Sequence, residues 1–359
     1  MRPVIVPFFI SHQGCKHQCI FCNQQKITGS GGELPAASEL LDKIAAFRIL
    51  GRSKSVGVAF YGGSFTSLPK PVMERLLLPL QPLLAQGEIG SIRVSTRPDN
   101  VDDGIAEFLL SLGVRTVELG VQSMDDQVLD LSGRGHTAAH TEEACRILKA
   151  AGMEVGIQLM PGLPGDTKEK ALTSLNAVLA LSPDFLRIYP TLVIAGTKLA
   201  TLYESGQYAP LSLDEAVRIC KVMLHATLAA AVKVIRIGLQ PTDELQASGS
   251  ILAGPYHPAF RQLVESDLYY DLLSMLTGGI PSEMTVKIIC APTRVSDITG
   301  QRQGNFKRLL NERGVKVAAV IADPSLSCQE IMVESGQVIK KGNIVHDLDY
   351  SRERYYLGR

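Results

Sequence analysis

Three cysteines lie within eight positions near the amino end of the chain, at Cys15, Cys19 and Cys22. Closely spaced thiols can bind zinc, form a redox pair or hold an iron–sulfur cluster. Structural zinc needs four ligands, and no further Cys or His follows at zinc-ribbon spacing. A redox pair needs only two thiols and leaves Cys15 without a role. The C-x3-C-x2-C spacing therefore favours a [4Fe–4S] cluster held at three corners, with its fourth iron open to a ligand.

The other four cysteines, at Cys145, Cys220, Cys290 and Cys328, are far apart in the sequence. We expect them to be buried as small hydrophobic residues, and we predict no second cluster. The composition is that of a globular enzyme, with 45% hydrophobic and 20% charged residues among 359. The formal net charge is zero, so no overall field attracts nucleic acid or membrane, although a local basic patch is compatible with it.

No stretch of the sequence is apolar over the roughly 20 residues that a membrane-spanning helix needs. The short apolar run at 1–10 gives way at once to polar residues and lacks the form of a secretory signal. We therefore expect a cytoplasmic protein without membrane contact.

Strands and helices alternate over the first two thirds of the chain, and these elements must position the cysteines. The expected strands are 4–10, 55–63, 91–96, 116–123, 154–162, 185–193 and 233–239, and the expected helices are 39–50, 71–85, 101–113, 141–152, 167–181 and 212–231. Alternation of this kind predicts a parallel sheet with right-handed crossovers. The strands are apolar almost throughout, as in parallel sheets covered on both faces. The pattern predicts an α/β fold, a partial (β/α)6-7 TIM barrel, whose site lies at the carboxyl ends of the strands.

The distinctive short motifs follow those carboxyl ends. They are the cysteine loop, YGGSFT at 61–66, STRPDN at 95–100, GVQSM at 120–124, MPGLPGDT at 160–167 and YPTLVIAGTKL at 189–199. Because the carboxyl ends of parallel strands meet at one rim, we expect these motifs to share a site. Gly62 and Gly63 allow the backbone there to approach a ligand closely.

The pattern changes after the last of these strands. The segment GSILAGPYHPAFRQL at 249–263 is rich in Gly and Pro and is expected to be a partly ordered connector. Residues 283–322 then show the order strand, helix, loop, helix, strand. We therefore divide the chain into a barrel at 1–240, a connector at 241–282 and a small α/β domain at 283–359.

The small domain resembles a K-homology core, in which a G-x-x-G loop clamps the nucleic-acid backbone. Gly300 begins the corresponding loop here, but the second glycine comes one place late, at Gly304. Arg302, Lys307 and Arg308 lie nearby, in the most basic part of the chain. Contacts to nucleic acid from Gly300 and these three residues are one interpretation. A solvated basic helix on a generic small domain is the other.

The cysteine motif, with Phe21 before Cys22 and at the end of a first barrel strand, resembles the radical S-adenosylmethionine (SAM) superfamily. The resemblance implies a [4Fe–4S] cluster bound by Cys15, Cys19 and Cys22, with SAM chelating the open iron. It also implies an electron donor such as flavodoxin or ferredoxin. Cleavage of SAM would give methionine and a 5′-deoxyadenosyl radical that abstracts a hydrogen atom from the substrate.

The later motifs are similar to the radical-SAM half of the Elongator catalytic subunit, over roughly residues 4–205, and more loosely to oxygen-independent coproporphyrinogen oxidases. The resemblance implies SAM contacts from Gly62, Gly63, Ser64, Ser95, Gln122, Arg134 and Gln158. Arg134 would pair with the SAM carboxylate, and Gln158 would hold the adenosyl ribose. Ser95 replaces the acidic ribose ligand of most relatives, and Ser64 replaces the glutamate of the commoner G-G-E motif.

The substrate follows less directly from the resemblance. Elongator modifies wobble uridines in tRNA, so RNA is one candidate and a small metabolite or free nucleobase is the alternative. No acetyltransferase-like segment is recognisable after residue 240, so complete wobble-uridine carboxymethylation is not expected. Asn23 stands where coproporphyrinogen oxidases have an extra cysteine, which disfavours porphyrinogen decarboxylation. A non-catalytic RNA-binding protein with a structural cluster is the alternative from another class, and no residue that reacts with the substrate is identified.

Overall fold

The computed structural model describes residues 4–29, 31–50 and 55–350. It divides the chain into two compact units. The first unit comprises Met1–Ser212 and Val232–Tyr256, and the second comprises Leu213–Ala231 and His257–Arg359. Each unit has its own main sheet.

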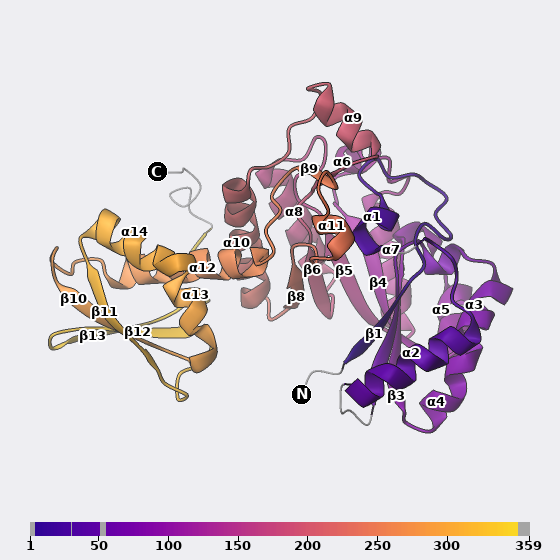
Figure 1. Cartoon of the computed structure of the whole chain (residues 1–359), viewed down its shortest axis with the longest axis horizontal. Coiled ribbons are helices and arrows are strands. Elements are labelled where there is room, and N and C mark those ends of the chain that lie inside the picture. The colour runs from indigo at the N-terminus through magenta and orange to yellow at the C-terminus, as the bar shows by residue number, and fades with distance from the viewer. Residues whose placement is uncertain (1–3, 30, 51–54, 351–359) are drawn as a thin grey trace. The chain divides into compact units, whose positions relative to one another are not determined.

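Within the described residues, the first unit is built on a curled sheet of seven parallel strands, in the order β1-β2-β3-β4-β5-β6-β8 (Figure 1). The strands are β1 (Ile5–Phe9), β2 (Val56–Tyr61), β3 (Ile89–Thr96), β4 (Val114–Gln122), β5 (Glu154–Leu159), β6 (Phe185–Ile188) and β8 (Lys233–Ile237). Their order in space follows their order in the chain, as in a (β/α) barrel. The predicted partial TIM barrel is confirmed.

The segments of the first unit that connect or follow these strands carry helices. They are α1 (Gln24–Thr28), α2 (Ala37–Leu50), α3 (Lys70–Leu77), α4 (Gln81–Ala85), α5 (Asp103–Ser111), α6 (Asp126–Leu131), α7 (Ala138–Ala150), α8 (Lys168–Ala180), α9 (Lys198–Glu204) and α11 (Asp243–Gln246). Several begin at a side chain that accepts a backbone hydrogen bond, such as Asp102 at α5 and Thr167 at α8. A short ribbon of β7 (Val193–Ile194) and β9 (Ile251–Ala253) completes the unit.

Prolines shorten two of the expected elements. The helix expected at 71–85 is divided into α3 and α4 by a 3-10 turn at Leu78–Leu80 that contains Pro79. The strand expected at 185–193 ends at Ile188, shortly before Pro190. Proline has no backbone N–H and therefore interrupts both helical and sheet hydrogen bonding.

The second unit contains a four-stranded sheet in the order β11-β10-β12-β13. Its elements are α10 (Leu213–Ala229), α12 (Phe260–Leu276), β10 (Thr285–Cys290), α13 (Val295–Thr299), α14 (Gly304–Arg313), β11 (Lys316–Ala322), β12 (Glu330–Ser335) and β13 (Val338–Asn343). The expected order strand, helix, helix, strand is present, with β10 and β11 parallel and the other pairs antiparallel. In the described part of the chain, no helix combines the length and apolarity that crossing a bilayer requires.

The two units differ from the expected division into 1–240, 241–282 and 283–359. Helix α10, expected within the barrel, belongs to the second unit. There Lys221 of α10 forms ion pairs of 2.6 Å with both Asp267 and Asp271 of α12. The expected connector also contains α12 itself, because the Gly- and Pro-rich stretch ends where this helix begins.

One of the four scattered cysteines is also placed differently from expectation. Cys145, Cys220 and Cys290 are buried, whereas Cys328 is exposed. Cys328 lies in the turn before β12, where its sulfur is 3.4 Å from the hydroxyl of Thr293. A turn at the surface leaves no apolar layer to cover the thiol.

Candidate active site

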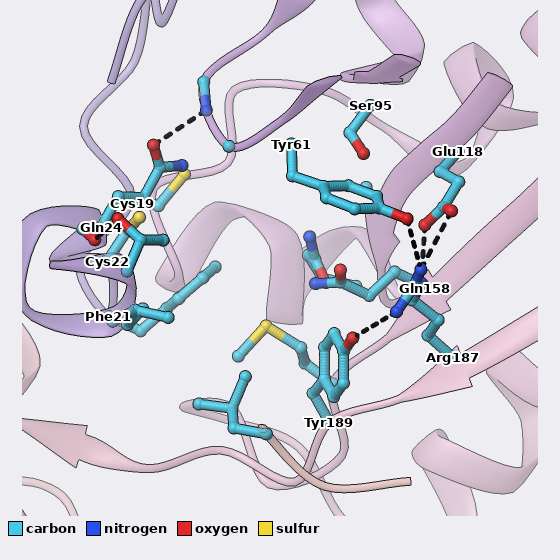
Figure 2. A pocket seen from close by; sticks show the side chains of 18 of the residues that line it. Cys19, Phe21, Cys22, Gln24, Tyr61, Ser95, Glu118, Gln158, Arg187 and Tyr189 are labelled. Carbon is cyan, nitrogen blue, oxygen red and sulfur yellow. Dashed lines mark hydrogen bonds and ion pairs between the residues drawn. The ribbon is translucent and has the colours of Figure 1, made fainter. Parts of the chain in front are cut away.

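A cavity of about 450 Å³ lies at the carboxyl ends of the strands of the first unit. This volume is within the usual range for small-molecule sites. The lining residues come from the cysteine loop and from the ends of the parallel strands. Figure 2 shows Cys19 and Cys22 on one side of the cavity and Glu118 and Arg187 on the other. The motifs expected at one rim therefore do meet there.

The loop after β1 brings the three cysteines to this cavity. Cys15, Cys19 and Cys22 all line it. Within the loop, the backbone N–H of Cys22 donates to the carbonyl of Cys19 at 3.1 Å, and that of Cys15 donates to the carbonyl of His12 at 3.3 Å. His12 has a positive φ of 59°, which tightens the turn before the first cysteine. Local turns thus bring all three cysteines to one cavity.

The electrostatics of the loop disfavour free thiolates. Burial raises the pKa of Cys15 and raises that of Cys22 to about 12, and the neighbouring Cys19 adds to both shifts. A positive counter-charge is needed to hold three thiolates here, and an iron cluster supplies one. The described residues contain no group of three His, Cys, Asp or Glu side chains arranged around one metal ion. Thiols that each bind a different iron of a cube lie further apart than ligands of one ion.

The glycine turn after β2 lies against the cysteine loop. Gly62 and Gly63 have φ values of 75° and 59°. A Cβ on Gly63 would lie 2.2 Å from the carbonyl oxygen of Gln13, so only glycine fits. The Gln24 side chain accepts a hydrogen bond from the Gly63 N–H at 2.8 Å (Figure 2). It accepts another from the backbone N–H of His12, in the cysteine loop. Sequence reasoning missed Gln24, whose only signal was its position two residues after the last cysteine.

Ser64 is placed differently from the expected SAM contact. Its side chain is fully buried and does not line the cavity. Its hydroxyl lies 3.0 Å from the Thr96 hydroxyl and accepts a hydrogen bond from the Asn100 amide at 3.1 Å. The glycine turn points this serine towards β3, where it holds the turn in place.

The other residues expected to contact SAM do line the cavity: Ser95, Gln122, Arg134 and Gln158. Gln122 ends β4 with a φ of 72°, next to an irregularity in the pairing with β5. Its side-chain oxygen accepts a hydrogen bond of 3.0 Å from the Gln158 amide. A left-handed non-glycine residue is costly and is often found at functional sites.

Two buried arginines next to the cysteine loop have unused hydrogen-bond donors. Arg134 donates to the sulfur of Cys19 at 3.1 Å, and Arg97 is paired with Asp99 at 2.9 Å. Within the described residues, however, Nε of Arg134 and Nη1 of Arg97 are buried without a partner. A buried donor without an acceptor costs about 1–3 kcal/mol. The residues therefore fit an acceptor-rich ligand beside the cysteines, as the carboxylate and ribose of SAM would be.

The opposite wall is an ion-pair network that sequence reasoning missed. Glu118 of β4 accepts from Arg187 at 2.6 Å and from Arg93 at 2.8 Å. Arg187 also donates to the hydroxyls of Tyr61 and Tyr189, at 3.0 and 3.1 Å (Figure 2). A signal was present in the sequence, because each charge interrupts an otherwise apolar strand. Charged residues are rarely buried unless they are paired.

The expected nucleic-acid contacts belong to the second unit: Gly300, Arg302, Lys307 and Arg308. Arg302 and Lys307 are exposed. Arg308 instead forms an ion pair of 2.8 Å with Asp267, and its guanidinium lies 3.6 Å from the centre of the Tyr270 ring. Gly300 and Arg302 both have positive φ, which makes the loop a tight turn. The geometry thus gives Arg308 a structural role, whereas the exposed side chains of Arg302 and Lys307 could contact a ligand.

Comparison with protein families gives matches over most of the chain. The model described as the radical SAM superfamily matches residues 9–178. The model described as the Radical_SAM C-terminal domain matches residues 183–270.

Similar curated proteins match over part of their length. A tRNA uridine(34) acetyltransferase of Methanocaldococcus jannaschii is 37% identical over 129 residues, which is 35% of this chain and 24% of that protein. Elongator complex protein 3 of Saccharomyces cerevisiae is 31% identical over 195 residues, which is 48% of this chain and 35% of that protein. The matches thus span a quarter to about a third of these relatives.

A solved structure supports the fold. The archaeal Elp3 of Methanocaldococcus infernus has a TM-score of 0.61 at 19% identity, over 96% of this chain and 75% of that one. Identity at this level shows a shared fold and nothing further.

Proposed function

Because the chain belongs to the radical SAM superfamily and is an enzyme of that class, we propose that it cleaves SAM reductively and abstracts a hydrogen atom from a tRNA. The observation that carries the first half is the placement of three cysteines beside two buried arginines with unused donors, on one cavity. Membership of the superfamily favours an enzyme over a non-catalytic RNA-binding protein.

Each residue at the cysteine end has a role in this proposal. Cys15, Cys19 and Cys22 would hold a [4Fe–4S] cluster. A cluster held there would supply the one-electron chemistry that splits SAM into methionine and a 5′-deoxyadenosyl group able to remove a hydrogen atom from the substrate. An external donor such as flavodoxin or ferredoxin would replace that electron. Arg134 would pair with the SAM carboxylate, since its guanidinium carries a buried Nε that has no partner among the residues that the structure describes.

The remaining lining residues would orient the other parts of SAM. The backbone at Gly62 and Gly63 would approach the methionine end, because glycine leaves room for close contact. Gln122 and Gln158, joined by their hydrogen bond, would contact the adenosyl ribose. These groups line one cavity, so they could contact a single SAM molecule together.

The tRNA part of the proposal is supported by the relatives. The M. jannaschii relative is described as a tRNA uridine(34) acetyltransferase. Two exposed basic residues, Arg302 and Lys307, lie on and just after the tight turn of the second unit. Cationic side chains on an exposed turn can contact phosphates of the RNA backbone.

A small-molecule substrate is the second candidate, and a specific observation favours it. Much of the positive charge of the second unit is used internally, since Arg308 and Lys221 pair with Asp267 and Arg294 pairs with Glu265. This leaves a smaller basic surface than the sequence indicates.

One experiment tests both parts of the proposal. Reconstituted protein reduced with dithionite is incubated with SAM, with or without deuterated tRNA, and 5′-deoxyadenosine is analysed by mass spectrometry. We expect 5′-deoxyadenosine in both cases and deuterium in it when tRNA is present. No 5′-deoxyadenosine would contradict SAM cleavage. The second candidate is favoured if 5′-deoxyadenosine carries no deuterium after incubation with deuterated tRNA but does carry it after incubation with a deuterated small-metabolite extract.

A further inference from the structure

Tyr61 and Tyr189 lie on the far wall of the cavity, and their hydroxyls can act as hydrogen-bond donors. Arg187 donates to both Tyr61 and Tyr189, so each phenol oxygen is already an acceptor. A phenol hydroxyl can also donate one hydrogen bond through its own O–H. In the part of the chain that the structure describes, neither hydroxyl has an acceptor for it. Both side chains line the cavity, so an acceptor can reach them from that space.

These phenols keep their protons at neutral pH. Burial raises the pKa of both Tyr61 and Tyr189, and the nearby carboxylate of Glu118 raises them further. Arg187 lowers the pKa of both tyrosines, but it is also paired with the negatively charged Glu118. Both hydroxyls therefore remain neutral donors.

Arg236 adds a positive charge to the same wall. It lies opposite Arg187 in the parallel pairing of β8 with β6, and both side chains line the cavity. Its guanidinium donates to the side-chain oxygen of Gln240 at 2.9 Å. For the described residues, no carboxylate lies within ion-pair distance of Arg236. Arg236 thus carries an uncompensated charge into the cavity.

The balance of charge on the whole lining is also positive. Among the described lining residues, Glu118 is the single carboxylate, and it is shared by Arg93 and Arg187. A wall of donors with surplus positive charge is complementary to a group that offers only acceptors and negative charge. Phosphate and carboxylate are the two common groups of that kind.

We propose that Tyr61, Tyr189 and Arg236 form an oxyanion-binding subsite that holds a phosphate or carboxylate of the substrate. The proposal rests on the proposed function, because it gives the cysteine end of the cavity to SAM and the opposite wall to the substrate. Figure 2 shows Tyr61 and Tyr189 grouped around Arg187, across the cavity from Cys19 and Cys22. Glu118 and Arg187 hold the two rings in place, so these two are positioning residues.

The subsite is tested by anion binding to the full-length, reconstituted protein. With the cluster oxidised and SAM saturating, so that the cysteine end is filled, inorganic phosphate is titrated and followed by 31P line broadening. Acetate is titrated separately and followed by its methyl proton signal. We expect at least one of the two anions to bind. Arg236→Gln should weaken binding about tenfold or more, as for loss of a charged hydrogen bond.

Further variants separate the subsite from general effects. Tyr61→Phe and Tyr189→Phe should each weaken binding several-fold, because each removes one donor. Arg236→Lys should fall between wild type and Arg236→Gln, since it keeps the charge but loses the planar fork. Arg115→Gln is the matched control, because Arg115 is exposed and lies outside the cavity lining. It should bind as wild type does.

Each outcome decides the proposal. Binding of phosphate alone supports a phosphate-bearing substrate, binding of acetate alone supports a carboxylate, and binding of both supports an oxyanion subsite without preference. If neither anion binds, or if Arg236→Gln and Arg236→Lys bind as well as wild type, the proposal is wrong. Formation of 5′-deoxyadenosine is measured in parallel. Its absence, with Arg236-dependent anion binding intact, contradicts the proposed function and leaves the subsite supported.

Discussion

Single residues decide the chemistry at the cysteine end of the cavity. Cys22 has a pKa raised to about 12 by burial and by the neighbouring cysteines. Such a thiol becomes a ligand only if a metal centre stabilises its thiolate. The adjoining guanidinium of Arg134 then serves two purposes, because it donates to the sulfur of Cys19 and keeps one buried donor unused.

The first prediction concerns the cluster ligands. Cys19→Ala should lose most of the bound iron, the cluster absorbance and SAM cleavage, because only two of three thiolates remain. Iron content and visible absorbance after anaerobic reconstitution measure the first two. Cys328→Ala is the matched control, because Cys328 is exposed and distant in sequence from the loop; it should keep all three properties. Full iron content in Cys19→Ala would contradict the assignment.

The second prediction concerns SAM affinity. Arg134→Ala should weaken SAM binding by about 1.5–3 kcal/mol, the range for a hydrogen bond to a charged group. Equilibrium dialysis with the oxidised cluster measures it. Arg146→Ala serves as the control, since Arg146 is an exposed arginine paired with Glu143 on α7. Equal SAM affinity in wild type and Arg134→Ala would show that Arg134 does not contribute to SAM binding.

At the scale of elements, the site depends on how the cysteine loop and the glycine turn fit together. The Gly63 N–H and the cysteine loop share one acceptor, the side-chain oxygen of Gln24 at the start of α1. The turn itself leaves no room for a Cβ at Gly63. The strand order β1-β2 places both segments at one rim, and α1 then fixes their spacing.

The third prediction tests that fit. Gly63→Ala should lower the free energy of unfolding by about 1–3 kcal/mol, because its φ of 59° is strained for alanine and a backbone oxygen occupies the space. SAM affinity should fall with it. Thermal unfolding and SAM binding measure the two effects. Gly31→Ala, where no atom of the described residues lies within 4 Å of the added Cβ, should leave both nearly unchanged. Equal stability of the two variants would show that the turn tolerates a side chain.

At the scale of the whole molecule, the chain combines two units with separate sheets. The cavity and all three cysteines belong to the first unit, whereas the candidate RNA contacts belong to the second. SAM cleavage and RNA binding should therefore respond to different substitutions.

The fourth prediction uses this separation. The double variant Arg302→Gln/Lys307→Gln should weaken tRNA binding and lower its salt dependence, because each lost phosphate contact reduces counterion release. SAM cleavage without tRNA should not change. Filter binding over a range of salt concentrations measures the effect, and Arg115→Gln is the control for loss of positive charge. If wild type does not bind tRNA even at low salt, the tRNA proposal fails.

Much of the fold followed from the sequence, because periodic elements and their order are local properties. Apolar strands alternating with helices sufficed to predict the partial barrel, and Pro79 accounts for the one divided helix. The placement of α10 did not follow. It packs with α12 through Lys221, Asp267 and Asp271, and a contact between segments almost fifty residues apart has no signature in either segment alone.

By itself, the sequence determined the cysteine triad and the glycine turn, because the chemistry of each depends on spacing within a few residues. Only the tertiary structure decided the opposite wall. Its residues come from four different strands, and each lies within a largely apolar stretch of the sequence: Tyr61, Glu118, Arg187 and Arg236. Whether such a side chain points into the barrel depends on strand register and sheet curvature. These are set by the packing of the whole sheet, so no single strand could have shown that the four residues meet.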